Sequence, residues 1–591
     1  MTGNELSVEP RQMSAAASTD RSRRALGAAL LVVALAVLPY LNSLSNGFAF
    51  DDPDVVRDNP MVTHDPPAAL FTAVYNPGAI YRPLTMLTYV ANHRVDAAPF
   101  GFHLVNVALH ALVTLAVFLL VRRLLDSLLA ATVAAALFAV HPVHTEAVSN
   151  VVGRAELLAA LLVVTTLLAT LRARAARGAA AWAWQVTALL AFAAGMLAKE
   201  SAFTAIGLVA VVVWWTDPAR SVTGAMRAIA PFVTLGAAYL ALRLVVVGSL
   251  GLPTPPPLID NPLAHVGAAR RVATAMVVLL DYGSLLMLPL HLAPDYSYNA
   301  VPMVASPLDG RFLLAALVAV AALGLAALLG PRVPVLLLAA AFIAIPLTVT
   351  ANILFPIGTI KAERLLYLPS IGWCLAVGWL AAAAARTHRR AALVAVAALV
   401  LAFATRTWAR NPDWNDNFSL FTAAVQSEPH SAKAHYNLGI AYDVRGDTDT
   451  AMVYLRRALR IHPDCAEAAL AIGSIYERKG LDAGALHWYA QAIARNWNYP
   501  RAHLNIGALR FQRGAYDAAE AAFRTGLEQD PDNPRLLFGL GLVLQAEGRR
   551  DEAQLVLAGI DADRVTDQSM RDALMAAALA AAVPAASGTR G

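Results

Sequence analysis

The chain has 591 residues, of which 58% are hydrophobic and only 15% are charged. This composition excludes an ordinary soluble globular protein and indicates many membrane spans, although residues after about 410 return to a soluble mixture. The formal net charge is +5, and the basic residues gather at the ends of apolar runs, which argues against nucleic-acid binding. The two cysteines, Cys374 and Cys465, provide neither a disulfide framework nor a thiolate metal site, so the redox compartment stays open.

The N-terminal 24 residues are polar and end in Arg21, Arg23 and Arg24, after which an apolar run extends from Ala25 to Leu41. This run is long enough to span a bilayer, and no small-x-small cleavage site stands clear of it. We therefore predict an uncleaved first helix with a cytoplasmic N-terminus rather than a signal peptide.

Three carboxylates, Asp51, Asp52 and Asp54, follow the first apolar run. Charged groups are costly to hold near lipid, so this cluster at the end of a span suggests a functional site. The alternative is a solvated loop that merely opens with acidic residues.

Apolar stretches of spanning length recur along the chain up to about residue 410. Eleven of them lie at 25–45, 103–121, 125–141, 155–171, 180–198, 202–216, 228–249, 311–330, 333–351, 365–385 and 391–408. With eleven spans, every arginine-rich segment between them falls on the cytoplasmic side, as the positive-inside rule requires. These segments are 21–24, 122–123, 172–177, 220–227, Arg332 and 386–390.

The stretch 270–292 tests this count, because Val272 to Leu292 is apolar enough to be a twelfth span. If it crossed, the basic segment Arg386–Arg390 would move to the outer side. We therefore predict a re-entrant or interfacial helix on the outer side.

The soluble region contains an internal repeat with a period of 34 residues. Two glycine positions and one alanine position recur at this spacing: Gly439, Gly473, Gly507 and Gly541; Gly446, Gly480, Gly514 and Gly548; and Ala451, Ala485, Ala519 and Ala553. This is the tetratricopeptide period, in which small residues lie where paired helices touch. The repeats predict a helical solenoid with a concave binding face.

Four regions follow from these patterns. We predict a cytoplasmic tail at 1–24, a polytopic membrane domain of about eleven spans at 25–410, a four-repeat tetratricopeptide domain at 411–564, and a capping helix and tail at 565–591. The predicted fold class is therefore all-α.

The polar motifs of the membrane domain all fall on the outer side of this topology, which argues for a shared cavity. They are Phe50-Asp51-Asp52, Tyr81-Arg82-Pro83-Leu84, His141 to Asn150, Gly153-Arg154-Ala155-Glu156, Ala198-Lys199-Glu200, Asp295-Tyr296-Ser297 and Glu363 to Ser370.

Together with Asn261-Pro262 and the repeats, these motifs resemble the TMTC-type family, the transmembrane and tetratricopeptide-repeat-containing proteins. The resemblance covers nearly all of the chain after residue 25 and is most specific from His141 to Leu158 and from Glu363 to Ser370. That family is similar to the GT-C glycosyltransferases and the protein O-mannosyltransferases. The resemblance implies a GT-C-like membrane enzyme that moves a sugar, such as mannose, from a polyprenyl-phosphate donor to hydroxyls of an outer-side protein acceptor.

The family's expected catalytic position is an acidic residue after the first span, which maps to Asp51 as the base. Asp52 and Glu146 are predicted to support it. Transfer from a lipid phosphate also needs cations that balance the leaving group. The residues predicted to hold the donor phosphate or substrate are Arg82, His141, His144, Arg154, Lys199, Glu200, Glu363 and Arg364.

Several of these residues have simpler interpretations. His141 and His144 lie three apart, as metal ligands on one helical face would, but loop packing or acceptor hydrogen bonding explains them as well. Lys199-Glu200 and Glu363-Arg364 are also compatible with internal ion pairs. No residue is assigned to a metal, no cofactor beyond the sugar donor is implied, and a divalent-metal requirement stays open.

The partners predicted for this chain are the lipid bilayer, a polyprenyl-phosphate sugar lipid and a protein or peptide acceptor on the concave repeat face. Its alanine- and arginine-rich usage suggests a bacterial inner-membrane protein with periplasmic repeats, whereas a eukaryotic relative would face the ER lumen. The competing hypothesis is a non-enzymatic membrane scaffold whose repeats assemble envelope proteins.

Overall fold

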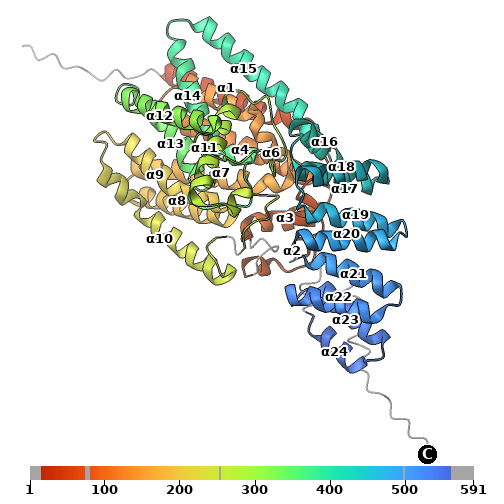
Figure 1. The fold of residues 1–591 in the computed structure, drawn as a ribbon. Helices are drawn as coiled ribbons and strands as arrows, with labels where there is room; N and C mark the ends of the chain where they lie inside the picture. Colours follow the sequence, from red (N-terminus) through yellow and green to blue (C-terminus); the bar gives the residue numbers. More distant parts are fainter. Residues whose placement is uncertain (1–14, 73–79, 252–253, 497–498, 561–591) are drawn as a thin grey trace, which may run out of the picture.

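A computed structural model describes residues 15–72, 80–251, 254–496 and 499–560, and within these ranges helices are the only regular elements. A helical membrane domain occupies the first two thirds of the chain, and a slender solenoid of paired helices extends from one end of it (Figure 1). The predicted all-α class is therefore confirmed. The predicted capping helix and tail at 565–591 lie outside the described residues.

Seven helical segments in the described residues are long and apolar enough to cross a membrane. The first is Ser22–Ser45, which contains most of α1 (Ala15–Val37) and the following 3-10 turn. Two others, Val151–Ala175 and Arg389–Trp414, contain α7 (Arg154–Ala175) and α15 (Arg389–Arg410). The rest are α4 (Pro99–Leu125), α8 (Gly178–Ala198), α10 (Val222–Val247) and α12 (Gly310–Leu329). An eighth candidate consists of α5 (Leu128–Val140) and the segment Pro142–Ser149, which contains α6 (Thr145–Ser149) and meets α5 at a 50° bend. Proline cannot continue a helix without losing a hydrogen bond, so Pro142 accounts for the bend.

Three shorter apolar helices occupy the remaining predicted stretches: α9 (Ala205–Thr216), α13 (Pro334–Leu347) and α14 (Ser370–Ala384). Each of the eleven predicted spans thus coincides with an apolar helix. Because these three are shorter than a full bilayer crossing, the count of eleven spans stays a prediction.

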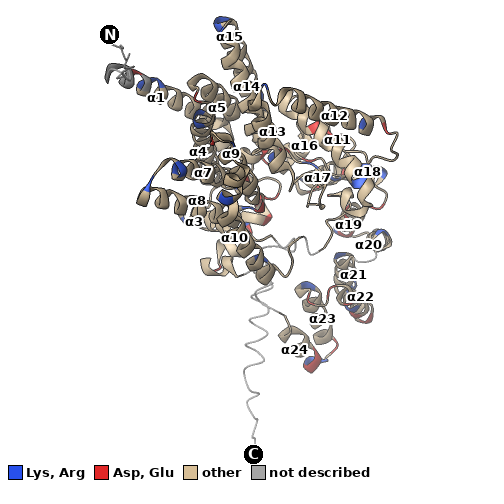
Figure 2. Ribbon diagram, turned by 90° about the vertical axis from the view of Figure 1, so that its left-hand side faces the viewer, with Lys and Arg blue, Asp and Glu red and all other residues tan. Residues whose placement is uncertain are grey.

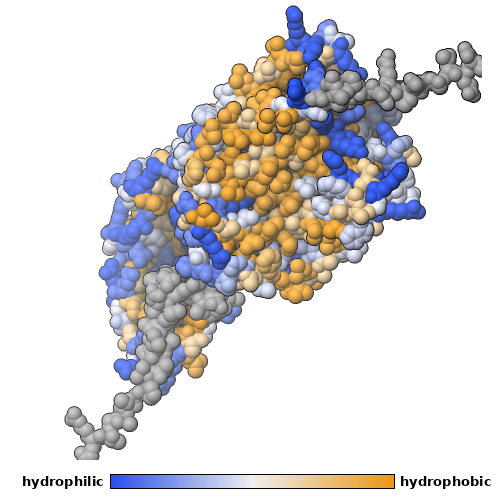
Figure 3. All heavy atoms as spheres, turned by 180° about the vertical axis from the view of Figure 1, so that it is seen from behind, coloured by the Kyte–Doolittle hydropathy of each residue, from blue (hydrophilic) through white to orange (hydrophobic). Residues whose placement is uncertain are grey.

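The outer surface of the bundle is broadly apolar, as Figure 3 shows for one face of the molecule. Large hydrophobic side chains are exposed along α8, α10 and α12, including Leu190, Val245 and Leu323. A face of this size is stable only against lipid or a partner. Lys and Arg instead lie at helix ends, for example at the start of α15 (Figure 2).

The helix α5 lies at the centre of the bundle, where it is buried from Val133 to Val140 and packs against α1, α4 and α14. Small residues line its contact with α14. At Gly378 of α14, an added Cβ would lie 2.5 Å from the Ala130 carbonyl oxygen and 3.0 Å from the Ala134 side chain, so the two helices touch backbone to backbone. Small residues permit this close approach in membrane bundles.

The helix α11 (Ala268–Met287) covers the stretch 270–292 and is absent from the candidate spans among the described residues. One side buries Thr274, Val278 and Tyr282, whereas Arg270 at its start is exposed. This two-sided character is what an interfacial helix needs, and its position on the outer side stays a prediction.

Single-cysteine labelling checks that position. Val95 is 87% exposed and Leu308 is 81% exposed, and both native cysteines are buried. If α11 does not cross, a membrane-impermeant thiol reagent should label Val95→Cys and Leu308→Cys from the same side, and Ala175→Cys from the opposite side. Labelling of Leu308→Cys together with Ala175→Cys would show that α11 crosses.

The repeat region contains α16 (Asn417–Ser427) and four helix pairs. The pairs are α17 (Ala432–Val444) with α18 (Thr448–Ile461), α19 (Ala466–Arg478) with α20 (Asp482–Arg495), α21 (Pro500–Gln512) with α22 (Tyr516–Gln529), and α23 (Pro534–Ala546) with α24 (Arg550–Ala558). They stack in sequence order away from the membrane domain (Figure 1).

The two glycine positions of the repeat have different roles. At Gly473 an added Cβ would lie 2.5 Å from the Tyr489 ring, so the first position lets the paired helices touch. At Gly480 the backbone has φ 70°, in the left-handed region that favours glycine, so the second position makes the turn between them. The same holds at the equivalent glycines 34 residues away.

The solenoid is held against the segment of the membrane domain that follows α11. The Ala432 N–H donates to the Tyr298 carbonyl at 2.6 Å, and the Asn299 N–H donates to the His430 carbonyl at 3.2 Å. The Tyr298 ring packs on the His462 ring with centroids 4.6 Å apart. These contacts fix the start of the solenoid relative to the membrane domain.

Glu428, at the end of α16, faces the membrane domain at this junction and should make the junction pH-dependent. Burial raises the pKa of Glu428 to about 7 from its ordinary value of 4.5, Lys361 opposes the rise, and Asp281 and Asp295 add to it. A carboxyl whose pKa is raised by folding contributes stability that is fully present below pH 4.5 and is lost as the pH rises through about 7.

We therefore expect the unfolding temperature of the repeat region to fall between about pH 5 and pH 8, and Glu428→Gln to flatten this dependence. Differential scanning fluorimetry of the purified protein measures it. The exposed Asp449→Asn is the matched control and should keep the wild-type slope. An equal slope in the Glu428→Gln variant would contradict the assignment.

Candidate functional site

Asp51 lies in the loop that follows the first span, between the membrane domain and the repeat region. Its side chain is exposed to solvent, yet protein atoms lie close around it. The water that these atoms displace would stabilise the charged carboxylate, so its loss raises the pKa of Asp51. The charges of Arg364 and Lys433 act against the rise, and those of Asp54 and Asp260 add to it. Asp51 is therefore an open carboxylate with two cations nearby, one from each region of the chain.

Asp52 is buried and ties the same loop to the segment before α7. Its carboxylate accepts hydrogen bonds from the N–H groups of Ala49 at 3.2 Å, Val151 at 3.4 Å and Val152 at 2.9 Å. Burial raises the pKa of Asp52 to about 7, and these backbone bonds limit the rise. Asp52 is thus placed to hold the loop in shape beside Asp51.

Glu146 lies on α6 and forms an ion pair with Arg364. Its other oxygen accepts a hydrogen bond from the Arg364 backbone N–H at 2.8 Å. Burial alone would lower the pKa of Arg364, but the charge of Glu146, followed by those of Asp51 and Glu156, raises it. Arg364 is therefore paired with Glu146, and its guanidinium also feels the charges of Asp51 and Glu156.

A second set of ion pairs involves Arg82, Lys199 and Arg243. Arg82 precedes α3 (Pro83–Val95) and donates from Nε and Nη2 to Glu200 at 3.1 and 3.0 Å. Glu200 also pairs with Arg243 of α10 at 3.4 Å, and Lys199 pairs with Glu156 of α7. Segments far apart in the sequence thus bring their charges to one end of the bundle.

This arrangement has the parts needed for group transfer to a hydroxyl. An accessible carboxylate can take a proton, and nearby guanidinium groups can bind a phosphate through paired N–H donors. The cations now neutralise Glu146, Glu156 and Glu200, so a bound anion would compete with these carboxylates. Within the described ranges, no group of three or more His, Cys, Asp and Glu side chains could hold a metal ion.

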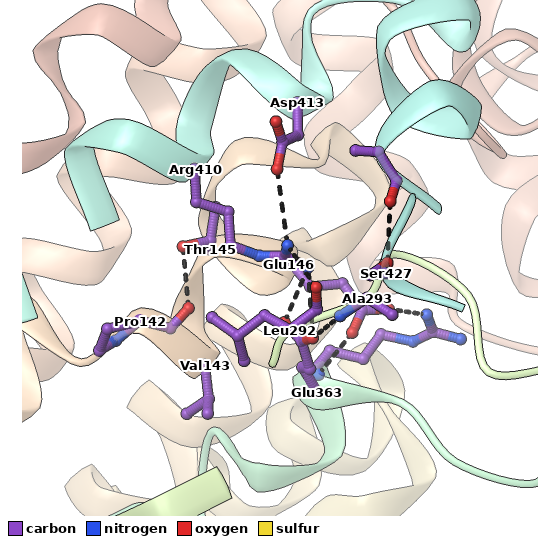
Figure 4. Close-up of polar contacts among 12 residues, drawn as sticks. Pro142, Val143, Thr145, Glu146, Leu292, Ala293, Glu363, Arg410, Asp413 and Ser427 are labelled. Carbon is purple, nitrogen blue, oxygen red and sulfur yellow. Dashed lines mark hydrogen bonds and ion pairs between the residues drawn. The ribbon is translucent and has the colours of Figure 1, made fainter. Parts of the chain in front are cut away.

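Glu363 is a predicted substrate-binding residue, but the structure buries it in an internal cluster. It pairs with Arg410 at 3.2 Å and accepts a hydrogen bond from the Ala293 N–H at 2.7 Å (Figure 4). It also accepts a hydrogen bond from the Tyr296 hydroxyl at 2.9 Å. Burial raises the pKa of Glu363 to about 7, against the Arg410 charge. Glu363 therefore joins the end of α15 to the 292–296 loop and does not face the open site.

His141 and His144 are also predicted to contact substrate, and the structure places them in the core. Both rings are fully buried: His141 Nε2 lies 3.1 Å from the Leu286 carbonyl, and His144 Nε2 lies 2.9 Å from the Ser370 hydroxyl. His144 also packs against Phe138. The packing interpretation of this pair accounts for both residues.

Arg154 is likewise occupied inside the protein rather than open to a phosphate. Its guanidinium donates to Asn106 at 2.9 Å, Asn92 at 3.0 Å and the Phe102 carbonyl at 3.0 Å, and it lies 4.8 Å from the Tyr89 ring centroid. These partners use its donors, so Arg154 connects α3, α4 and α7.

Arg243, Asp260 and Lys433 also form ion pairs here, although none of them belongs to a predicted polar motif. An arginine inside the predicted span 228–249 is a signal for Arg243, because charges within spans face polar interiors. Lys433 gives no such signal, since a lysine on a solenoid helix is ordinary.

Fold and site together define a multi-span helical membrane protein with a tetratricopeptide solenoid and a charged site where the two meet. Family models described as "Tetratricopeptide repeat" match residues 432–465, 453–500 and 510–578, and one described as "Protein O-mannosyl-transferase TMTC, DUF1736" matches residues 257–323.

The chain is similar to TMTC-type proteins over most of its length, so the predicted resemblance is confirmed. It is 31% identical over 468 residues to mouse protein O-mannosyl-transferase TMTC3, covering 73% of this chain and 50% of the mouse protein. The Drosophila melanogaster Tmtc3 protein is 29% identical, covering 77% of this chain and 57% of its own length. Human protein O-mannosyl-transferase TMTC4 is 28% identical, covering 72% of this chain and 65% of the human protein. The chain thus spans about half the length of the mouse relative.

Proposed function

We propose that this chain is a membrane glycosyltransferase that moves a sugar, such as mannose, from a polyprenyl-phosphate donor to hydroxyl groups of a protein acceptor. The observation that carries the proposal is the accessible Asp51 carboxylate, on which the charge of Arg364 acts while Arg364 itself pairs with Glu146. The names of the relatives, protein O-mannosyl-transferases, support the same reaction class.

In this reaction Asp51 takes the proton of the acceptor hydroxyl as its oxygen forms a bond to the anomeric carbon. The bond from that carbon to the phosphate oxygen breaks, and the lipid phosphate leaves with the bonding electron pair. A base works best when its pKa lies near the working pH, and burial moves the pKa of Asp51 upward, toward that range.

The leaving phosphate would be balanced by Arg364 and Arg82, which carry the guanidinium geometry suited to phosphate oxygens. Lys199 is the third candidate, although its pairing with Glu156 must open first. Asp52 would act by holding the loop of Asp51 in shape, and Glu146 would act by positioning Arg364. The acceptor would reach Asp51 from the concave face of the repeats on the outer side, in a bacterial cell the periplasm.

The second candidate function is a membrane-anchored scaffold, which the four stacked helix pairs favour because solenoids present extended binding faces. A scaffold would bind envelope proteins without modifying them.

Mass spectrometry of envelope proteins from cells with and without this chain tests the proposal. We expect hexose-modified Ser or Thr peptides only when the chain is present. Purified protein supplied with polyprenyl-phosphate mannose should transfer mannose to those same peptides. Identical glycopeptide profiles, together with no transfer in the purified system, would favour the scaffold.

A further inference from the structure

The loop that carries Asp51 is held from the repeat side as well as from the membrane side. The Gly47 N–H donates to the Asn415 carbonyl at 2.9 Å, and the Phe50 N–H donates to Asn417 Oδ1 at 2.7 Å. The Phe50 ring meets Trp414 edge to face, with centroids 6.5 Å apart. The residue before Asp51 is therefore docked on the start of the repeat region.

Phe50 has a backbone conformation that phenylalanine seldom adopts. Its φ is 59°, in the left-handed region, where the side chain of a non-glycine residue crowds the backbone. The hydrogen bond to Asn417 and the ring packing offset the cost of this crowding. Because the φ of Phe50 sets the direction in which the chain continues, Asn417 helps to fix where Asp51 points.

Lys433 brings a positive charge from the first turn of α17 to the same place. Its Nζ lies 2.6 Å from Asp260 Oδ1 and 5.7 Å from the centroid of the Phe50 ring. Arg364, Asp54 and Asp260 also act on Asp51, and the adjacent Asp52 is coupled to it by charge. Lys433 and Arg364 are thus the two cations of this group, and only Lys433 comes from the repeats.

We propose that the repeat region completes the transferase site, with Asn417 fixing the direction of Asp51 and Lys433 setting the charge around it. Both are positioning residues, since they act through Asp51. The inference rests on the proposed function for its catalytic meaning. It assigns to the solenoid a part in the chemical step in addition to acceptor binding.

The first test measures Asp51 without any transfer reaction. Carbodiimide reacts with protonated carboxyl groups, so its reaction with Asp51 in the full-length protein can be followed by mass spectrometry against pH. Removing a nearby cation raises a carboxyl pKa, so Lys433→Met should move the reaction midpoint to higher pH by about one unit. Lys433→Arg should keep the wild-type midpoint. Lys479→Met, which removes an exposed lysine elsewhere in the solenoid, should also leave it unchanged.

The second test measures transfer from polyprenyl-phosphate mannose to a Ser- and Thr-containing peptide. Asn417→Ala should lower kcat about tenfold with little change in the KM for the peptide, because misplacement of the base affects the chemical step. Asn417→Asp keeps an acceptor oxygen for the Phe50 N–H and should recover most of kcat. A purely structural role would lower the folded yield of both variants together.

The outcomes separate the two proposals. If wild-type protein transfers no sugar but Lys433→Met moves the Asp51 midpoint, the proposed function fails and the charge coupling stands. The inference is overturned if wild-type protein transfers sugar, Lys433→Met has the same Asp51 reaction midpoint as Lys479→Met, and Asn417→Ala has the same kcat as Lys479→Met.

Discussion

Asp51→Asn should abolish sugar transfer while leaving the fold intact. The amide has nearly the shape of the carboxylate but cannot accept the acceptor's proton, and loss of a general base lowers the rate by about 100- to 10,000-fold. Asp51 is accessible, so its replacement creates no unpaired buried group. Initial rates with polyprenyl-phosphate mannose and the unfolding temperature together measure both parts of the prediction.

Asp54→Asn is the matched control for this variant. Asp54 is an exposed acidic residue of the same loop and has no proposed role in the reaction. Its replacement removes one negative charge near Asp51 and should keep most of the transfer activity. If the Asp51→Asn variant transferred sugar at the wild-type rate, Asp51 would not be the base, and the acidic cluster would be an ordinary solvated loop.

Arg410→Met should be among the most destabilising substitutions in the chain. Arg410 is the buried partner of Glu363, and removal of one member of a buried pair leaves the other charge without compensation. Such a change costs about 3–5 kcal/mol. Folded yield and unfolding temperature in detergent measure the loss.

The double variant Glu363→Gln with Arg410→Met should recover part of that loss, because neither charge remains. Arg478→Met breaks an exposed pair with Asp443 and should have little effect. If Arg410→Met were as stable as Arg478→Met, the buried pair would have no structural importance.

The repeat region could be predicted from the sequence because its packing is local and periodic. Each pair of helices needs a small residue at their contact and a glycine in the left-handed conformation at their turn. Glycines equivalent to Gly473 and Gly480 therefore recur every 34 residues. The membrane helices are predicted by a different local property, the length of an apolar run.

The site could be predicted only in part, because topology indicates on which side of the membrane a residue lies but not which partner it has. Asp51, Glu146 and Arg364 come together, and the predicted topology gives them a common side. Glu363 and Arg154 share that side, yet each has internal partners that no sequence pattern displays. Their positions depend on distant groups such as Arg410 and Asn106.

The attachment of the solenoid also bears on how its length can change. The contacts that hold it lie between Asn417 and His462, in the first part of the solenoid, while α24 lies at its far end (Figure 1). Each added helix pair in a solenoid packs mainly on its neighbour. A repeat inserted after α24 would therefore lengthen the surface that we propose binds the acceptor, without moving Asp51. Under the proposed function, acceptor range and catalytic geometry would then be separately adjustable.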